Sequence, residues 1–194
     1  MPTQMVIVDL NKDELADNSG DKAMITWMEK SISRYNPIHM VVPQGSIRNY
    51  SEITNFQEVE KPKILAGLPE VVRNGIKTVK KKTFGWVAID GQNTMEYNEK
   101  IWIPSAAELN LQQSAARQIE SDDPYSYFSG SDNIGHNVFK FGKTNRTSPS
   151  NMNNVALRTF TSSSNYADSI DNNGRFVSGA DSQFPNYLII GFCT

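Results

Sequence analysis

Apolar residues recur at helical spacing early in the chain, and this pattern predicts an amphipathic helix over residues 19–36. Asn18 or Ser19 can cap the start of the helix, and Pro37 would end it because proline cannot continue a helix. The residues on its buried face would be Ala23, Met24, Trp27, Met28, Ser31, Ile32 and Tyr35.

A later group of apolar positions predicts a second, shorter helix. These positions are Leu65, Leu68, Val71, Val72 and Ile76. Residues 38–42 predict a short buried strand, whereas residues 43–63 are polar and irregular. A loop of that length inside a compact domain is usually functional or bound to a partner. Residues 43–63, like residues 1–20, are therefore candidates for contact with a neighbouring subunit.

Short apolar runs separated by turn residues dominate the rest of the chain. They predict strands or extended segments over residues 84–89, 101–104, 138–141, 155–161, 175–178 and 187–193. Asp90-Gly91 predicts a turn, and Asn173-Gly174 predicts a hairpin that leads into the strand at residues 175–178. Predicted helices in the early part of the chain and short predicted strands in the later part favour an α+β fold.

Ser105 and Glu108 have the spacing of a capping box, in which each side chain satisfies a free amide hydrogen at the start of a helix. The pair predicts a helix that runs from Ser105 through Leu109 to about Gln118. Capping explains Ser105 without a nucleophilic role, because no G-x-S-x-G turn surrounds it.

The chain has 194 residues, of which 38% are hydrophobic, and this fits one domain with a real core. We expect residues 1–20 to form an N-terminal arm or first strand and residues 21–194 to form the single domain. A formal net charge of -2 disfavours a general nucleic-acid binder, and no apolar run is long enough to span a membrane. The run at residues 5–8 is too short for a secretion signal, so we expect synthesis in a cytoplasm.

Motifs for cofactor, metal and nucleophilic chemistry are missing from the sequence. Neither a glycine-rich phosphate loop nor the zinc pattern H-E-x-x-H occurs, and His39 and His136 lack neighbours at ligand spacing. Residues 171–174 superficially resemble a calcium loop but are more typical of a hairpin turn. Cys193 is the single cysteine, which excludes a disulfide framework. We therefore expect no catalytic residues, no metal and no cofactor.

Two groups of residues have both a structural and a functional interpretation. The basic run at residues 80–82, with Lys77, predicts a solvated strand or turn, or else a surface for an acidic partner. The tryptophans lie in apolar periodic segments, which favours core anchors over a stacking platform for a ligand. They are Trp27, Trp86 and Trp102.

Aromatic residues in a polar loop would indicate a partner if they are exposed. The candidate partner-binding loop residues are Tyr125, Tyr127, Phe128, Asn145, Arg146, Asn165 and Tyr166. The candidate assembly residues lie within the polar segment at residues 43–63. They are Arg48, Tyr50 and Phe56. Many short Ser and Asn side chains in the second half of the chain suit adaptable contact surfaces.

Residues 100–109, KIWIPSAAEL, resemble the K-[IL]-W-[LI]-P-S-x-x-E-L element of an uncharacterised domain of phage virion proteins and bacterial surface proteins. The resemblance covers roughly residues 9–194. The other stretches that agree in order and spacing are residues 24–28, 68–70, 76–83, 157–163 and 191–193. They match the family's early tryptophan helix, its L-P and I-x-x-V-x-K-x-T segments, its W-x-R-S strand and its final G-F-C.

That domain is similar to the C-type-lectin-like and formylglycine-generating-enzyme group. The resemblance implies a C-type-lectin-like fold, with two helices flanking a small twisted antiparallel sheet and long irregular loops on one side. The enzyme members need a pair of cysteines for copper, and this chain has Cys193 alone. The Glu-Pro-Asn and Trp-Asn-Asp elements of calcium-dependent sugar binding are missing, and Leu157 replaces the tryptophan of the W-x-R-S strand.

The resemblance implies a non-enzymatic virion protein of a phage, such as a capsid-surface, head-fibre or tail component. It would contact other virion proteins and further copies of itself, with a host-surface glycan or protein as a further candidate partner and no nucleic-acid or membrane partner. One alternative is a bacterial surface adhesin or ligand-binding module of the same fold. A remote alternative is an enzyme of the formylglycine-generating type.

Overall fold

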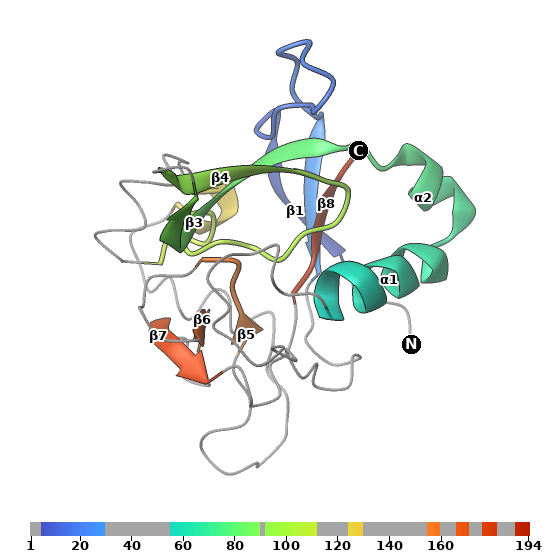
Figure 1. Ribbon diagram of the computed structural model, residues 1–194. Helices are drawn as coiled ribbons and strands as arrows, with labels where there is room; N and C mark the ends of the chain where they lie inside the picture. The colour runs from blue at the N-terminus through green and yellow to red at the C-terminus, as the bar shows by residue number, and fades with distance from the viewer. Residues whose placement is uncertain are drawn as a thin grey trace.

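The central sheet of the computed structural model brings the first and last strands of the chain together (Figure 1). β1 (Met5–Leu10), β2 (Ile25–Glu29) and β8 (Gly191–Cys193) are antiparallel neighbours in the order β1-β2-β8. The structure describes residues 5–29, 55–89, 92–111, 124–129, 155–159, 166–170, 176–181 and 189–194.

β2 corrects the helix predicted over residues 19–36, because residues 25–29 form a strand with a partner on each side. Thr26 and Met28 are buried whereas Ile25 and Trp27 are half-buried, so burial follows the two-residue period of a strand over residues 25–28; Glu29 is buried as well. In so short a segment, the positions of the apolar residues fit the period of a helix as well as the period of a strand. Pairing with β1 and β8 decides in favour of a strand. The β-branched and aromatic side chains of this segment are also common in strands. Residues 30–36 lie outside the described part.

β3 (Val79–Ile89) and β4 (Gln92–Glu99) form a long antiparallel hairpin, which confirms the strand predicted over residues 84–89. The strand begins earlier than predicted and includes the whole basic run. The turn predicted at Asp90-Gly91 falls between the two strands and lies outside the described residues.

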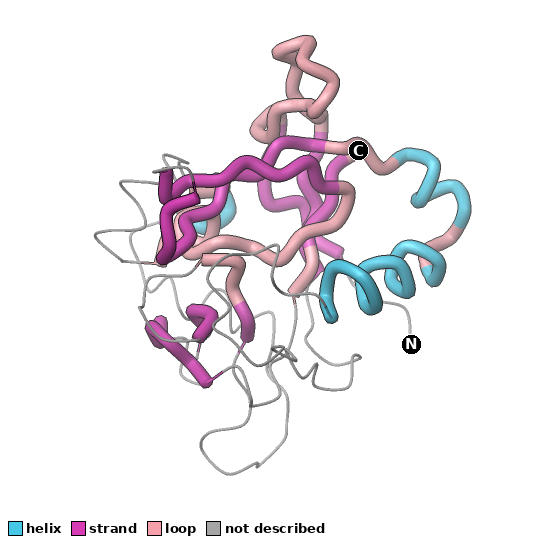
Figure 2. The backbone as a smooth tube through the Cα atoms, in the orientation of Figure 1, coloured by secondary structure: helices cyan, strands magenta, loops and turns pink. Residues whose placement is uncertain are grey.

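Two short helices, α1 (Lys61–Gly67) and α2 (Glu70–Gly75), occupy the place of the second predicted helix. They are separated at Pro69, because proline disfavours the helical conformation of the residue before it. A π-helix, η2 (Asn55–Glu60), leads directly into α1, so the irregular excursion predicted over residues 43–63 is wrong from residue 55 onward. Figure 2 shows these helices together on one side of the strands.

A third sheet consists of β5 (Val155–Ala156), β6 (Tyr166–Ile170) and β7 (Phe176–Asp181), in that order. Antiparallel pairing of β6 with β7 confirms the predicted hairpin, although its turn lies outside the described residues. Three small antiparallel sheets with a few short helices make the described chain an α+β structure, as predicted.

Other predicted strands are shorter than expected or cannot be compared. The strand predicted over residues 155–161 ends at Ala156. Of the strand predicted over residues 187–193, the structure describes residues 189–193, and within these Gly191–Cys193 are in a strand. The strands predicted over residues 38–42 and 138–141 lie outside the described residues.

Two clusters of buried side chains form the core. Phe192 and the fully buried Trp102 belong to the first cluster, and Trp27 packs against it. Val8 and Met28 belong to the second cluster. The predicted role of core anchor is therefore confirmed for Trp102 and Trp27, whereas the side chain of Trp86 lies outside the described part.

Substitution of Gly191 by alanine should destabilise the protein. A Cβ atom there would lie 2.9 Å from Cε2 of Trp102. Two backbone hydrogen bonds of 2.9 and 3.1 Å join these residues, so the strand has little room to shift. We expect Gly191→Ala to lower the free energy of unfolding by about 1–3 kcal/mol, measured by urea denaturation.

The matched control is Gly67→Ala at the end of α1, where a Cβ atom would meet nothing within 4 Å. It should leave stability unchanged or raise it slightly, because alanine favours the helix. Equal stability of Gly191→Ala and the unaltered protein would contradict the close packing against Trp102.

Candidate functional site

Glu108 lies in a single helical turn whose start is capped as the sequence predicts. The Glu108 amide donates a hydrogen bond to the Ser105 hydroxyl at 3.2 Å, and the Ser105 amide donates to the Glu108 carboxylate at 3.0 Å. This reciprocal pair confirms the capping box, and with it the structural role of Ser105. It also fixes the direction in which the Glu108 carboxylate points.

The turn ends at Asn110, so the continuous helix predicted from Ser105 to Gln118 is wrong at this residue; residues 112–118 lie outside the described part. Asn110 has a φ of 56°, a left-handed conformation that asparagine tolerates at the end of a helix. The Leu111 amide then donates to the Ala106 carbonyl at 2.9 Å, a hydrogen bond typical of a Schellman motif. The side-chain amide of Asn110 donates to the carbonyl of Phe128 at 2.8 Å, which ties this turn to the next described segment.

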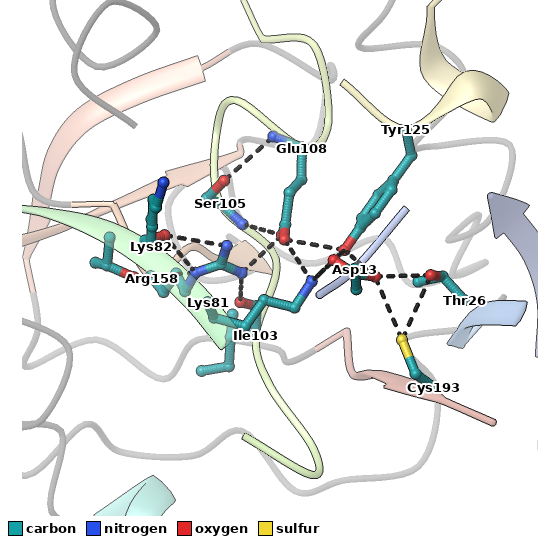
Figure 3. A network of polar contacts seen from close by, with 11 residues as sticks. Asp13, Thr26, Lys81, Lys82, Ile103, Ser105, Glu108, Tyr125, Arg158 and Cys193 are labelled. Atoms are coloured by element: carbon teal, nitrogen blue, oxygen red, sulfur yellow. Dashed lines mark hydrogen bonds and ion pairs between the residues drawn. The ribbon is translucent and has the colours of Figure 1, made fainter. Parts of the chain in front are cut away.

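Arg158 provides the first cation that faces Glu108. Its Nη1 donates to Glu108 Oε2 at 2.6 Å and to the Ile103 carbonyl at 2.8 Å, and its Nε donates to the Thr83 hydroxyl at 3.0 Å. Arg158 is fully buried. Figure 3 shows its guanidinium group between β3 and the turn that carries Glu108.

Lys81 of β3 provides the second cation. Its Nζ donates to Glu108 Oε1 at 3.0 Å and to the Tyr125 hydroxyl at 2.6 Å, and it contacts the Asp13 carboxylate. Nζ also lies 3.9 Å from the centroid of the Trp102 ring, within the range of a cation–π interaction. Only 1% of the Lys81 side chain is exposed, so the prediction of a solvated basic run is wrong at this residue.

Asp13, in the connection between β1 and β2, completes the network. Its Oδ2 accepts hydrogen bonds from the Thr26 hydroxyl at 2.7 Å and from the Cys193 thiol at 3.3 Å. The Tyr125 hydroxyl lies 3.3 Å from each of the two Asp13 oxygens. Burial, and secondarily Asp13, raise the pKa of Cys193, so this thiol stays protonated and can donate.

Within the described residues, the network contains two cations and two carboxylates, so its charges balance. Burial alone would raise the pKa of Glu108, but the neighbouring Arg158 and Lys81 outweigh burial and hold that pKa well below its ordinary value. Burial alone would lower the pKa of Lys81, but Glu108 and Asp13 raise it. The network is therefore a set of buried ion pairs in this structure.

A polar pocket of about 150 Å³ opens beside this network. Asp13, Glu108 and Tyr125 form the part of its wall that belongs to the network. The remaining lining residues are Lys12, Glu14, Lys22, Lys80, Lys82 and Glu96. The pocket is smaller than the roughly 300 Å³ at which sites for drug-sized ligands begin. Charges of both signs and this small volume suit water or a small polar group.

The aromatic residues predicted to lie in an exposed loop differ in how much of each side chain is exposed. Tyr125 and Phe128 are each 1% exposed, so the expected exposure is wrong for both. Tyr127 is 47% exposed, so the expected exposure is confirmed for this residue. Phe56 is fully buried in the first core cluster and offers no surface to a neighbouring subunit.

The remaining candidate residues cannot be compared with the structure. Tyr166 begins β6, but its side chain lies outside the described part. The candidates that lie wholly outside the described residues are Arg48, Tyr50, Asn145, Arg146 and Asn165, together with His39 and His136.

Asp13 and Arg158 were not predicted as site residues, and Lys81 was expected on the surface. One signal of its burial is present in the sequence: Lys81 lies between Val79 and Thr83 at two-residue spacing, so all three share one face of β3. Val79 and Thr83 are buried as well. No comparable local signal marks Asp13, because its partners come from distant segments.

Searches for a metal site and a membrane span, both limited to the described residues, gave negative results. His, Cys, Asp and Glu side chains do not gather there in groups of three that could hold a metal ion. None of the described helices is long and apolar enough to cross a membrane.

Comparison with known proteins finds no matching family model, no matching curated protein and no matching solved structure. The geometry of the network and the resemblance described above are therefore the grounds for a functional proposal.

Removal of Arg158 should destabilise the fold strongly. Arg158→Met keeps much of the side-chain volume but leaves the two buried carboxylates with one cation. Breaking a buried ion pair by removing one partner costs about 3–5 kcal/mol, and we expect a loss of this size in urea denaturation.

The matched control is Lys80→Met, which removes the Lys80–Glu14 ion pair at the rim of the pocket. It should change stability little, because water screens this pair. Similar small losses for both variants would contradict a structural role of the buried network.

Proposed function

We propose that this chain is a non-enzymatic structural protein of a phage virion, a capsid-surface, head-fibre or tail component with a C-type-lectin-like fold. It acts through contacts with copies of itself and with other virion proteins. The observation that carries this proposal is a group of exposed apolar side chains at one side of the central sheet.

These side chains belong to β1 and to the start of β2. Ile7 is 45% exposed and Leu10 is 58% exposed. Leu10 pairs with Ile25, and Ile7 pairs with Trp27, so Ile7 and Leu10 lie on the face of the sheet that also carries these two half-buried residues. Met24, which precedes β2 and is 67% exposed, adds a further apolar side chain.

Adjacent exposed apolar residues favour a protein contact, whereas scattered ones need no explanation. Among the strands that the structure describes, β1 lies at the edge of its sheet, and an edge strand suits addition of a neighbouring subunit. The location agrees with the expectation that residues 1–20 contact such a subunit.

The buried network supports the family resemblance that underlies the proposal. Most of its members, though not Asp13 and Tyr125, come from stretches that resemble the family: Lys81 and Thr83, Ser105 and Glu108, Arg158, and Cys193. Residues from separate matched motifs therefore contact one another in a single buried network. The combination of short helices with small antiparallel sheets is α+β, the class to which the implied fold belongs.

The chemical state of the network supports a structural role rather than catalysis of an external reaction. Each of the two carboxylates of the network contacts a buried cation, and burial raises the pKa of the Cys193 thiol, so this thiol stays protonated. A second candidate function, a ligand-binding module on a cell surface, is favoured by the charged pocket that opens beside Asp13 and Glu108.

The proposal is tested by light scattering of the purified chain over a range of concentrations. We expect an oligomer whose mass falls to that of a monomer in Leu10→Ser/Met24→Ser, because these changes remove apolar area from the contact. Near-ultraviolet circular dichroism would show that the variant is folded.

Val71→Ser is the matched control, since Val71 is an 81% exposed apolar residue on α2, away from the proposed contact. It should leave the oligomer intact. A monomer at every concentration, or equal dissociation by the control, would contradict the proposed assembly surface.

A further inference from the structure

Asp13 and Lys81 face each other across an antiparallel pairing of the β1–β2 connection with β3. Leu15 pairs with Val79, and the Lys80 amide donates to the Glu14 carbonyl at 2.9 Å. Two residues further along this register, Asp13 is opposite Lys81. The Lys81 side chain is 1% exposed and the Asp13 side chain 8%, and the amine contacts the carboxylate. The two reactants of an amide bond are therefore held together away from bulk water.

Glu108 and Tyr125 provide a route for protons around this pair. Glu108 Oε1 lies 3.0 Å from Lys81 Nζ. The Tyr125 hydroxyl lies 2.6 Å from Nζ, 2.9 Å from Glu108 Oε1 and 3.3 Å from Asp13 Oδ1. A proton that leaves Nζ can thus reach Asp13 Oδ1 through Glu108 and the tyrosine hydroxyl.

The two oxygens of Asp13 have different surroundings, which assigns them different roles. Oδ1 is the oxygen in contact with Lys81 Nζ. Oδ2 accepts hydrogen bonds from Thr26 at 2.7 Å and from Cys193 at 3.3 Å. Donors at Oδ2 polarise its bond to Cγ and stabilise negative charge that develops there during attack on Cγ.

We propose that Asp13 and Lys81 condense into an amide that crosslinks the β1–β2 connection to β3, with Glu108 as the catalytic residue that transfers protons. The Nζ–Cγ bond forms and the Cγ–Oδ1 bond breaks. Nζ loses two protons, and both end on Oδ1, which leaves as water. Glu108 returns to its initial state, and the reaction needs neither an oxidant nor a further reactant.

Proximity and charge favour this condensation. Reacting groups held in contact reach effective molarities of roughly 10⁵–10⁸ M, which opposes hydrolysis of the product. The amide also removes one buried ion pair, and Glu108 keeps Arg158 at 2.6 Å as its counter-ion. The pocket lined by Asp13, Glu108 and Tyr125 gives the released water a way out.

Proton transfer from Lys81 to Glu108 is opposed by the charges of the network, because the carboxylates favour the ammonium form of Lys81 and the cations favour the ionised form of Glu108. Glu108 must therefore accept a proton before Nζ can attack. This requirement distinguishes a role of Glu108 in proton transfer from a purely structural role, because the glutamine of Glu108→Gln cannot accept the proton.

Intact mass spectrometry of the full chain under denaturing conditions tests the proposal. We expect a mass lower than that of the sequence by one water molecule. Trypsin cleaves after lysine and should yield a branched peptide that joins residues 13–22 to residues 81–82. A folded protein with the unreduced mass and no branched peptide would overturn the proposal.

Variants identify the groups involved. Lys81→Arg keeps the positive charge and should abolish the mass loss, whereas the matched control Lys80→Arg should retain it. Glu108→Gln, once shown to be folded by near-ultraviolet circular dichroism, should lose at least nine-tenths of the crosslink. Full crosslinking of folded Glu108→Gln would overturn the catalytic role of Glu108, and crosslinking of Lys81→Arg would overturn the assignment of Lys81.

Lys61 and Glu99 provide a comparison within the same molecule. They also form a contact between an amine and a carboxylate, but 17% of the Lys61 side chain is exposed. Lys61→Arg should leave the loss of water unchanged. A mass loss that disappears in this variant would place the crosslink at Lys61 and overturn the proposal.

Discussion

The Glu108 carboxylate, buried between Arg158 and Lys81, is the constraint on which the rest of the structure depends. An ionised carboxylate cannot remain away from water without paired charges and hydrogen-bond donors. Those partners come from β3 and from the segment after β5, and the capping box fixes the carboxylate toward them. Any arrangement of these segments that separates the charges leaves one of them buried and unpaired.

The need to pair these buried charges explains why β3 adopts one register better than it explains the stability of the fold. Buried ion pairs add little net stability, because the cost of desolvation offsets the attraction. A shift of β3 by one residue, however, would turn Lys81 to the other face of its strand and bring Lys80 or Lys82 toward the carboxylates. The network thus selects one register among those that apolar packing alone would allow.

Local features of the structure could be predicted from the sequence, because their signals lie within a few residues. The Ser105–Glu108 capping box depends on a spacing of three residues, and the β3–β4 and β6–β7 hairpins contain dipeptides that favour turns. The core positions of Trp27 and Trp102 likewise follow from apolar surroundings.

Features that depend on distant partners could not be predicted in this way. Residues 25–29 become a strand because β8 pairs with them, and Thr26 meets Cys193 across 167 positions of sequence. The burial of Lys81 depends on Asp13, 68 positions away. The helix predicted beyond Leu109 ends at Asn110, whose side chain bonds to Phe128. In each case a tertiary contact decides between local alternatives that the sequence leaves open.

Native-state hydrogen exchange tests most directly whether the charge network joins these segments into one cooperative unit. The account predicts that the amides of Leu109, Leu111 and Arg158, which donate to backbone carbonyls around the network, exchange only through global unfolding. Their free energies of opening should then equal that of β2 and respond equally to urea. Exchange of these three amides through a smaller, local opening while β2 stays protected would contradict the account.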